Sequence, residues 1–343
     1  MKLRWKPIVL HYKHPFKIAR ADTYSASENV IVEIEHEGVL GTGEASPADY
    51  MGEDKASVLA GLAEIDAARN ELLGKDPMLL EDICARLAAR YPKRAALRCG
   101  VELALHDLVC KKLKVPLFRF FGLDPAKAGR TCWTIGIDAP EVMLAKAKEA
   151  AGYPLKVKLG TDYDVEIIRD LRAMTAEPIR IDGNCGWDVP RAKKTLKAVE
   201  KYDIDLCEQP CHPRLDDRVA EVARSTDIPV VADESVNDAA DVARLAGVYD
   251  GINIKLTKSG GVREAFKMAA VARAHGMVIQ IGCMGESCVS ITAAAHLTPL
   301  VDFVDLDSPL LFADDPYRGV KILPGGQMVL PRKPGLGVSP KGA

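Results

Sequence analysis

The sequence predicts an α/β fold in which a closed TIM-like barrel carries a smaller α+β capping domain. Its 343 residues suit one barrel-sized domain with a companion. From about Thr131 onward, β-rich segments alternate with amphipathic helical stretches, a pattern typical of a parallel sheet. The first 120 residues lack this alternation. We expect a capping domain over 1–125, the barrel over 126–310, and a C-terminal segment, 311–343, that packs on the capping domain.

Eight candidate strands support the barrel. They occupy residues 131–137, 154–160, 178–184, 203–210, 228–235, 251–258, 277–283 and 303–307. Helical candidates lie between them, and their apolar residues recur at intervals of three and four, as in 165–174, 191–202 and 261–276. In a barrel of parallel strands and helices, reactive groups are expected at the C-terminal strand ends.

The N-terminal region is expected to contain a strand pair followed by helices. The strands are predicted around 8–17 and 29–35, a glycine-rich turn at 41–47, and helices near 55–73 and 94–113. After Pro309 the chain is rich in proline and glycine, which predicts irregular structure and short strands.

Composition argues against several classes of protein. Hydrophobic residues make up 48% and charged residues 27%, which is unlike a disordered or fibrous chain. Lys and Arg total 46 against 48 Asp and Glu, so the formal net charge of -2 offers no general attraction to nucleic acid or membranes. The nine cysteines form no CxxC pair, which indicates reduced thiols. No long apolar run or signal-like N-terminus is present, which predicts a cytoplasmic protein.

Charged residues stand at the C-terminal ends of successive candidate strands, where a barrel interior would otherwise be apolar. Such charges are costly to bury unless they are paired or bind a metal. Three carboxylates come from consecutive strands, so they can converge, and an all-oxygen set favours magnesium over zinc. For any one carboxylate, a salt bridge or a helix cap is the alternative. The sequence predicts Mg²⁺ held by Asp182, Glu208 and Asp233.

Lys158 and Lys255 flank these carboxylates, one strand before and one strand after. Two lysines on opposite faces of a carbon can remove a proton from one face and return it to the other, as a racemase requires. To act as bases near neutrality, their pKa must fall from about 10.4 to roughly 7–8, and Lys156 with a nearby dication provides like charge for that shift. Lysines that only neutralise the carboxylates would have raised pKa values instead.

These residues lie in motifs that resemble the enolase superfamily, muconate lactonizing subgroup. The KxK of LKVKLG, the Asp of IRIDGN, the Glu of CEQP, the Asp of VADES and the Lys of INIKLTKSGG occur in that order. The superfamily uses a Lys or His base with magnesium stabilising an ene-diolate. The resemblance implies this mechanism in a (β/α)7β barrel under an α+β cap, with Lys158 serving the R substrate and Lys255 the S substrate.

Within the subgroup, the GCMGES segment at 282–287 and the acids Asp305 and Asp307 resemble those of dipeptide epimerases, such as enzymes acting on L-Ala-D/L-Glu. Two carboxylates on one face suit a substrate ammonium, while magnesium holds the substrate carboxylate. The resemblance also implies that loops 19–28 and 45–54 close over the substrate. It implies substrate contacts at Thr134, Lys156, Cys283 and Gly285, and Arg20 is a candidate partner for an acidic substrate side chain.

Two alternatives stay open. An N-acylamino acid racemase, o-succinylbenzoate synthase or muconate cycloisomerase has the same scaffold, but its substrate lacks the free ammonium that Asp305 and Asp307 favour. A catalytically silent binding protein is the alternative of another class, and the presence of both lysines argues against it. We expect a small-molecule dipeptide substrate, Mg²⁺ as cofactor, and neither nucleic acid nor membrane as partner; a homo-oligomer is left open.

Overall fold

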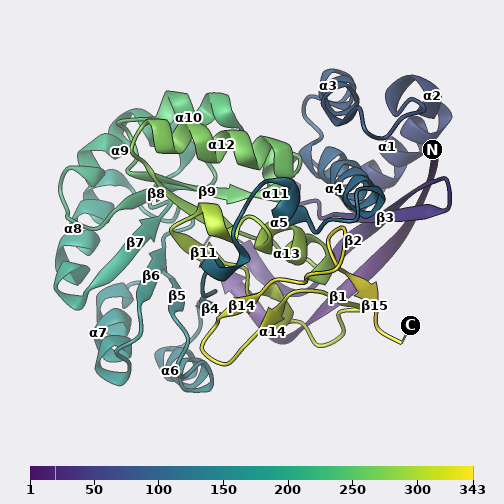
Figure 1. Ribbon diagram of the computed structural model, residues 1–343. Coiled ribbons are helices and arrows are strands. Elements are labelled where there is room, and N and C mark those ends of the chain that lie inside the picture. The colour runs from purple at the N-terminus through teal and green to yellow at the C-terminus, as the bar shows by residue number, and fades with distance from the viewer. Residues whose placement is uncertain (20, 343) are drawn as a thin grey trace.

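The computed structural model describes residues 1–19 and 21–342, with the side chains of these residues except Phe16 and 21–24. Figure 1 shows two parts: a ring of strands surrounded by helices, and a smaller part that contains the N-terminus. None of the helices in the described part of the chain is both long and apolar enough to cross a membrane. All nine cysteines are free thiols, as predicted.

The larger part is an eight-stranded parallel sheet whose strand order follows the chain from β4 to β11. Thr131 pairs with Val304 in an isolated parallel bridge, which joins the first strand to the last. All eight strands lie within the predicted segments, so the predicted barrel is confirmed. They are β4 (Trp133–Ile135), β5 (Leu155–Lys158), β6 (Ile179–Asp182), β7 (Ile204–Glu208), β8 (Val230–Ala232), β9 (Gly251–Lys255), β10 (Val278–Gly282) and β11 (Phe303–Asp305).

Helices connect successive strands and lie outside the ring, as Figure 1 shows for α6 to α10 and α12. The helix α8 illustrates why, since Val189, Ala192, Leu196 and Val199 form one buried stripe. These residues belong to the same apolar cluster as the strands. The helices are α6 (Pro140–Glu149), α7 (Asp164–Met174), α8 (Val189–Val199), α9 (Asp216–Ala223), α10 (Ala239–Leu245), α11 (Leu256–Ser259), α12 (Val262–Ala274) and α13 (Cys288–Ala295).

The capping domain pairs a three-stranded antiparallel sheet with four helices and has an apolar core of its own. The first two strands are longer than predicted, and residues 21–28, expected as a loop, are strand. The elements are β1 (Lys2–Ile18), β2 (Ala21–His36), β3 (Val39–Ala45), α1 (Lys55–Ala67), α2 (Arg69–Leu72), α3 (Leu80–Arg90) and α4 (Ala95–Lys112).

The glycine-rich segment at 41–47 was predicted as a turn, and this prediction is wrong because 41–45 belong to β3. Its glycines serve a close approach between strand and helix. A Cβ at Gly41 would lie 2.1 Å from the backbone oxygen of Ala104 in α4, and one at Gly43 would lie 2.2 Å from that of Gly100. Glycine therefore lets β3 lie directly against α4.

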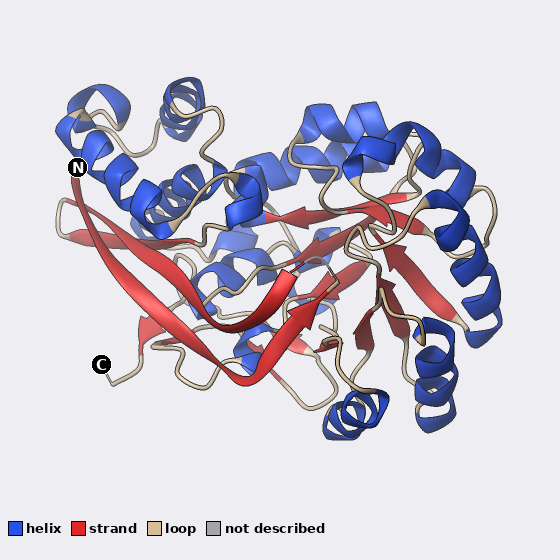
Figure 2. Ribbon diagram, turned by 180° about the vertical axis from the view of Figure 1, so that it is seen from behind, coloured by secondary structure: helices blue, strands red, loops and turns tan. Residues whose placement is uncertain are grey.

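The capping domain reaches over the mouth of the barrel. Figure 2 shows β1 and β2 as long curved strands that run from the N-terminus to the barrel. At their far end, the Ile137 amide donates to the Lys17 carbonyl at 3.0 Å. Ala19 packs against the turns after β5 and β6, since a Cβ at Gly160 would lie 2.7 Å from the Ala19 Cβ. The hairpin therefore covers the side of the mouth where Lys158 and Asp182 lie.

The C-terminal segment contacts both parts of the molecule. Phe312 pairs with Tyr12 of β1, while Gln327 pairs with Arg130 just before the barrel. Its apolar side chains, such as Met328 and Leu336, join the apolar cluster of the barrel. The domain boundaries at 125 and 310 stay predictions. The remaining short elements are α5 (Leu117–Phe120), α14 (Ser308–Leu311), β12 (Tyr317–Arg318), β13 (Lys321–Ile322), β14 (Met328–Val329) and β15 (Ser339–Pro340).

Candidate active site

The predicted lysines meet different carboxylates at the C-terminal strand ends. In the parallel register, Lys158 stands beside Asp182 and Asp182 stands beside Glu208. The Lys158 Nζ lies 2.6 Å from Asp182 Oδ2, and the Lys255 Nζ lies 2.8 Å from Asp233 Oδ2. Both lysines and both carboxylates are buried. The structure therefore places the two lysines on opposite flanks of the acidic cluster.

Lys156 lies between the acids and contacts three of them. Its Nζ is 3.2 Å from Asp182, 2.7 Å from Glu208 and 2.6 Å from Asp305. Lys156 points into the barrel because it lies two residues before Lys158, on the same side of β5. Carboxylates from β6, β7 and β11 therefore converge on one cationic nitrogen.

A fourth lysine belongs to the cluster, although the sequence analysis did not single it out. The Lys258 Nζ lies 2.5 Å from Asp233 Oδ1 and also donates to the Asp233 backbone carbonyl. Lys258 was assigned to a strand, but the chain turns into α11 directly after Lys255. A helical spacing of three residues between Lys255 and Lys258 was the signal available in the sequence.

The charges shift one another's pKa strongly. Burial alone would raise the pKa of Asp182, but Lys158 and Lys156 lower it to about 2. Burial raises the pKa of Glu208 to about 7, and the negative charges of Asp182 and Asp233 act in the same direction. The negative charge of Asp233 acts to raise the pKa of both Asp182 and Glu208, so each of these two carboxyls responds to the charge of the third.

The predicted lowering of the lysine pKa depends on a dication beside the carboxylates and stays a prediction; among the protein groups alone, the pKa of Lys255 shifts upward. Burial would lower the pKa of Lys255, but the negative charges of Asp233 and Glu208 outweigh it and hold the pKa well above its ordinary value. The same balance, with Asp305 as the largest opposing charge, raises the pKa of Lys156. For both lysines, the carboxylates bonded directly to the ammonium outweigh the like charges nearby.

The acidic cluster has the chemistry of a site for a hard divalent cation. Within the described residues, no three Asp, Glu, His or Cys side chains are arranged as a ready metal site. Nevertheless, Asp182 and Glu208 both contact the Lys156 ammonium, so their oxygens already converge on one small cation. Buried, all-oxygen and anionic donors of this kind suit Mg²⁺. The residues present therefore fit that ion.

Asp305 ends the last strand, β11, and Asp307 follows two residues later. Asp305 contacts the same Lys156 ammonium as Asp182 and Glu208. Asp305 accepts hydrogen bonds from Lys156 and from the Cys132 thiol, whose Sγ lies 3.1 Å away. Asp307 Oδ2 accepts a hydrogen bond of 2.7 Å from the Thr134 backbone amide. Burial and the neighbouring charge of Asp305 raise the pKa of Asp307 to about 6. Asp305 is thus already paired with a cation, whereas Asp307 accepts a hydrogen bond from a neutral backbone amide.

The loop after β10 carries two further predicted contacts and is held by the capping domain. The Gly285 carbonyl accepts hydrogen bonds from Ser27 at 2.8 Å and from Asn29 at 2.7 Å. A Cβ at Gly285 would lie 2.8 Å from the Ser27 hydroxyl, so a larger residue would disturb this contact. Cys283 Sγ lies 3.4 Å from the Ser308 hydroxyl. Arg20 lies outside the described residues.

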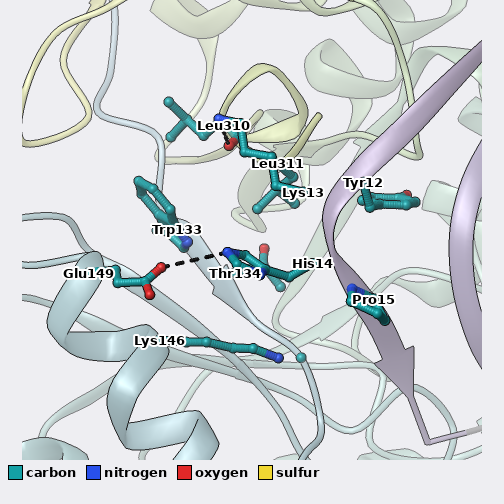
Figure 3. Close-up of a pocket in the computed structure, with 11 residues that line it drawn as sticks. Tyr12, Lys13, His14, Pro15, Trp133, Thr134, Lys146, Glu149, Leu310 and Leu311 are labelled. Carbon is teal, nitrogen blue, oxygen red and sulfur yellow. Dashed lines mark hydrogen bonds and ion pairs between the residues drawn. The ribbon is translucent and has the colours of Figure 1, made fainter. Parts of the chain in front are cut away.

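A cavity of about 130 Å³ lies beside Thr134, between β1, β4, α6 and α14 (Figure 3). Its apolar lining includes Tyr12, Trp133 and Leu311, and at one edge His14 faces Glu149 with 3.9 Å between Nε2 and Oε2. The cavity lies near the Asp307 carboxylate, because the backbone amide of its lining residue Thr134 donates to Asp307 Oδ2 at 2.7 Å.

The capped barrel and its buried lysines and carboxylates define a protein of the enolase class. Residues 142–343 match the family described as "Enolase C-terminal domain-like", and residues 7–122 match "Mandelate racemase / muconate lactonizing enzyme, N-terminal domain". The chain belongs to the mandelate racemase and muconate lactonizing enzyme family of the enolase superfamily, which confirms the resemblance seen in the sequence.

Relatives of known name are similar over nearly the whole chain. An L-Ala-D/L-Glu epimerase of Bacteroides thetaiotaomicron is 42% identical over 343 residues, covering 98% of this chain and 88% of that protein. The crystal structure of a dipeptide epimerase from Cytophaga hutchinsonii, complexed with Mg and D-Ala-L-Val, has a TM-score of 0.94 and 30% identity over 99% of this chain and 95% of that one. The substrate-liganded L-Ala-D/L-Glu epimerase of Bacillus subtilis has a TM-score of 0.91 and 30% identity, with coverage of 98% and 99%.

Proposed function

We propose that this protein is a magnesium-dependent dipeptide epimerase that inverts the α-carbon of the C-terminal residue of an L-Xaa-D/L-Xaa dipeptide. The observation that carries the proposal is the placement of Lys158 and Lys255 on opposite flanks of one acidic cluster, with Asp305 and Asp307 beyond it. The names of the relatives support the same reaction.

The metal ligands in this proposal are Asp182, Glu208 and Asp233, whose buried oxygens fit Mg²⁺. When bound, Mg²⁺ supplies positive charge to the substrate carboxylate and so stabilises the negative charge that develops there when the α-proton leaves. Lys156, which contacts Asp182 and Glu208, adds positive charge on the same side.

The lysines move the proton. The Nζ of one lysine takes the α-proton from one face of the carbon, the C–H electron pair spreads into the carboxylate as an ene-diolate, and the ammonium of the other lysine returns a proton to the opposite face. Net protonation is unchanged over a turnover, because one lysine gains the proton that the other loses. By analogy with the family, Lys158 serves the R substrate and Lys255 the S substrate.

The other end of the dipeptide is assigned to the last strand. Asp307, assisted by Asp305, would bind the substrate ammonium, because both carboxylates are buried and Asp307 bonds a backbone amide rather than a cation. The N-terminal side chain lies one carbon from that ammonium, so we place it in the cavity beside Thr134 (Figure 3). Cys283 and Gly285 border the substrate on the loop after β10, and Arg20 is the candidate partner of an acidic C-terminal side chain.

The first substrate to test is L-Ala-L-Glu, because the relative that is 42% identical is named an L-Ala-D/L-Glu epimerase. A dipeptide library incubated with the protein and Mg²⁺ in deuterated water should take up one deuterium at the α-carbon of the C-terminal residue, detected by mass. Uptake confined to N-acylated amino acids would instead favour the N-acylamino acid racemase alternative. No uptake by any dipeptide or acylated acid would favour the silent binding protein.

A further inference from the structure

Glu208 is held by two buried amides that the sequence analysis did not single out. Asn253 Nδ2 donates to Glu208 Oε1 at 2.8 Å, and Gln280 Nε2 donates to Glu208 Oε2 at 2.7 Å. All three side chains have 0% exposure. Each carboxylate oxygen of Glu208 therefore has its own neutral donor, one from β9 and one from β10.

The two amides come from neighbouring positions of the sheet. Asn253 and Gln280 are register partners in the parallel pair of β9 and β10. Each lies two residues before the end of its strand, and Asn253 therefore shares the inward face with Lys255. The two side chains thus form a layer of the barrel interior below the cluster of lysines and carboxylates.

The hydrogen bonds to Glu208 fix which atom of each amide, nitrogen or oxygen, faces the carboxylate. The oxygens Asn253 Oδ1 and Gln280 Oε1 have no hydrogen-bond partner within the described residues. A flipped amide would place its oxygen against a carboxylate oxygen, two acceptors in contact, so the nitrogen must face Glu208. The unpartnered oxygens destabilise the folded protein, because each has lost its hydrogen bonds to water without gaining a partner in the protein.

Gly282 makes room for this arrangement. A Cβ at Gly282 would lie 2.6 Å from Asn253 Oδ1 and 2.8 Å from Asn253 Nδ2. Any larger residue at this position of the GCMGES segment would therefore push the Asn253 amide away from Glu208. Glycine is therefore needed at position 282 because the Asn253 amide occupies the space that a side chain would fill.

We propose that Asn253 and Gln280 are positioning residues for the divalent metal ion, which they serve by holding the Glu208 carboxylate in one orientation. Asp182 and Asp233 accept hydrogen bonds from lysine ammonium groups. Glu208 Oε2 also lies 2.7 Å from the Lys156 ammonium, but the two amides orient the Glu208 carboxylate without adding further positive charge that would compete with the ion. The inference rests on the proposed function, because it takes Glu208 as a metal ligand. Loss of a group that orients a ligand typically costs 10–100-fold in metal affinity.

The test compares Mg²⁺ affinity, by isothermal titration calorimetry, in the wild type and in Asn253→Leu and Gln280→Met, which keep the side-chain size and remove the donor. Each variant, checked for its fold by circular dichroism, should bind Mg²⁺ about 10–100-fold more weakly. The matched control is Asn29→Leu, which removes a buried asparagine amide that donates to another buried glutamate, Glu44, at 2.8 Å and to the Gly285 carbonyl at 2.7 Å, neither of which is a proposed metal ligand. This control should leave the Mg²⁺ affinity unchanged.

A spectroscopic readout separates positioning from general loss of packing. With Mn²⁺ as the probe ion, the electron paramagnetic resonance spectrum of the folded Asn253 and Gln280 variants should differ from that of the wild type, while Asn29→Leu should match it. If the two variants do not fold, Gly282→Ala takes their place, since it keeps both amides and displaces one. Weaker Mg²⁺ binding by Gly282→Ala supports the inference, and unchanged binding overturns it.

The outcomes also separate this inference from the proposed function. Folded Asn253→Leu and Gln280→Met proteins that bind Mg²⁺ as tightly as the wild type overturn the positioning role alone. A wild type that binds no Mg²⁺ overturns both. A wild type that binds Mg²⁺ but exchanges no dipeptide α-proton overturns the proposed reaction and leaves the positioning role to be decided by the same affinities.

Discussion

The Lys156 ammonium lies 2.6 Å from a carboxylate oxygen of Asp305. This buried ion pair joins β5 to β11 inside the barrel. The same nitrogen contacts Asp182 and Glu208, so one lysine links the proposed metal ligands to the acids proposed to bind the substrate ammonium. The two ends of the proposed substrate site therefore share a counter-charge rather than acting as separate sites.

Replacement of Lys156 by Met should destabilise the protein by about 3–5 kcal/mol in the presence of EDTA. Its removal leaves buried carboxylates without their shared cation, and breaking a buried ion pair from one side costs about that much. Urea unfolding measures the change. The control Lys197→Met removes an exposed ion pair with Glu200 and should cost less than about 1 kcal/mol. Equal losses in the two variants would contradict the central role of Lys156.

Replacement of either flanking lysine should stop proton exchange from one enantiomer only. With Lys158→Ala, α-deuterium uptake from one configuration of the C-terminal residue should fall about 10²–10⁴-fold, the usual contribution of a general base, while the other configuration still exchanges. Lys255→Ala should show the reverse preference. The control variant Lys197→Ala, whose substitution lies on the outer helix α8, should exchange the α-protons of both enantiomers as the wild type does. Loss of exchange from both enantiomers in each variant would rule out two independent bases.

Replacement of Asp307 by Asn should weaken binding of free dipeptides about tenfold or more, because a hydrogen bond to a charged group contributes about 1.5–3 kcal/mol. Calorimetric titration with the dipeptide and with its N-acetyl derivative measures this effect. The acetylated ligand has no ammonium, so its affinity should change little or improve in the variant. Parallel losses for the two ligands would show that Asp307 does not bind the ammonium.

Replacement of Leu311 by Trp should fill part of the 130 Å³ cavity shown in Figure 3. If this cavity receives the N-terminal side chain, dipeptides that begin with Leu or Phe should lose kcat/KM at least tenfold, whereas those that begin with Ala should keep most of theirs. The comparison of the two substrate sets is itself the control for folding. A uniform loss across both sets would place the N-terminal side chain elsewhere.

His296 should make the stability of the protein depend on pH. Burial lowers the pKa of His296 to about 4, despite its 3.0 Å hydrogen bond with the Leu336 carbonyl. The unfolded chain binds a proton near pH 6.5 that the folded chain resists, so stability is full above pH 6.5 and is lost as the pH falls. Between pH 6.5 and 5 the loss is about 2 kcal/mol, at about 1.4 kcal/mol per unit.

Urea unfolding at pH 7 and pH 5 measures this loss against His296→Gln, which keeps a donor and does not titrate in that range. The wild type should lose about 2 kcal/mol more than the variant on acidification. If the two proteins respond to pH equally, His296 is not the group responsible.

Some features of the site could be predicted from the sequence, and others could not. Asn253 lies two residues before Lys255, so the alternation of a strand already placed it inside the barrel. Its partner Glu208, however, is 45 residues away, and no local pattern connects them. The glycines of β3 resemble a turn in the sequence for a related reason: their role is contact with α4, more than 50 residues along the chain.

Local patterns in the sequence were enough to predict the barrel, the capping region and the residues at the strand ends, including Lys158, Asp182 and Lys255. These follow from local periodicity and from the rule that parallel strands end at one face. Which charges meet became clear only in the folded protein, where Lys156 donates a hydrogen bond to Asp305, 149 residues further along the chain. The reason is physical: a pKa or an ion pair depends on distances of a few Å between atoms, and those distances are set only when strands far apart in the chain close into a barrel.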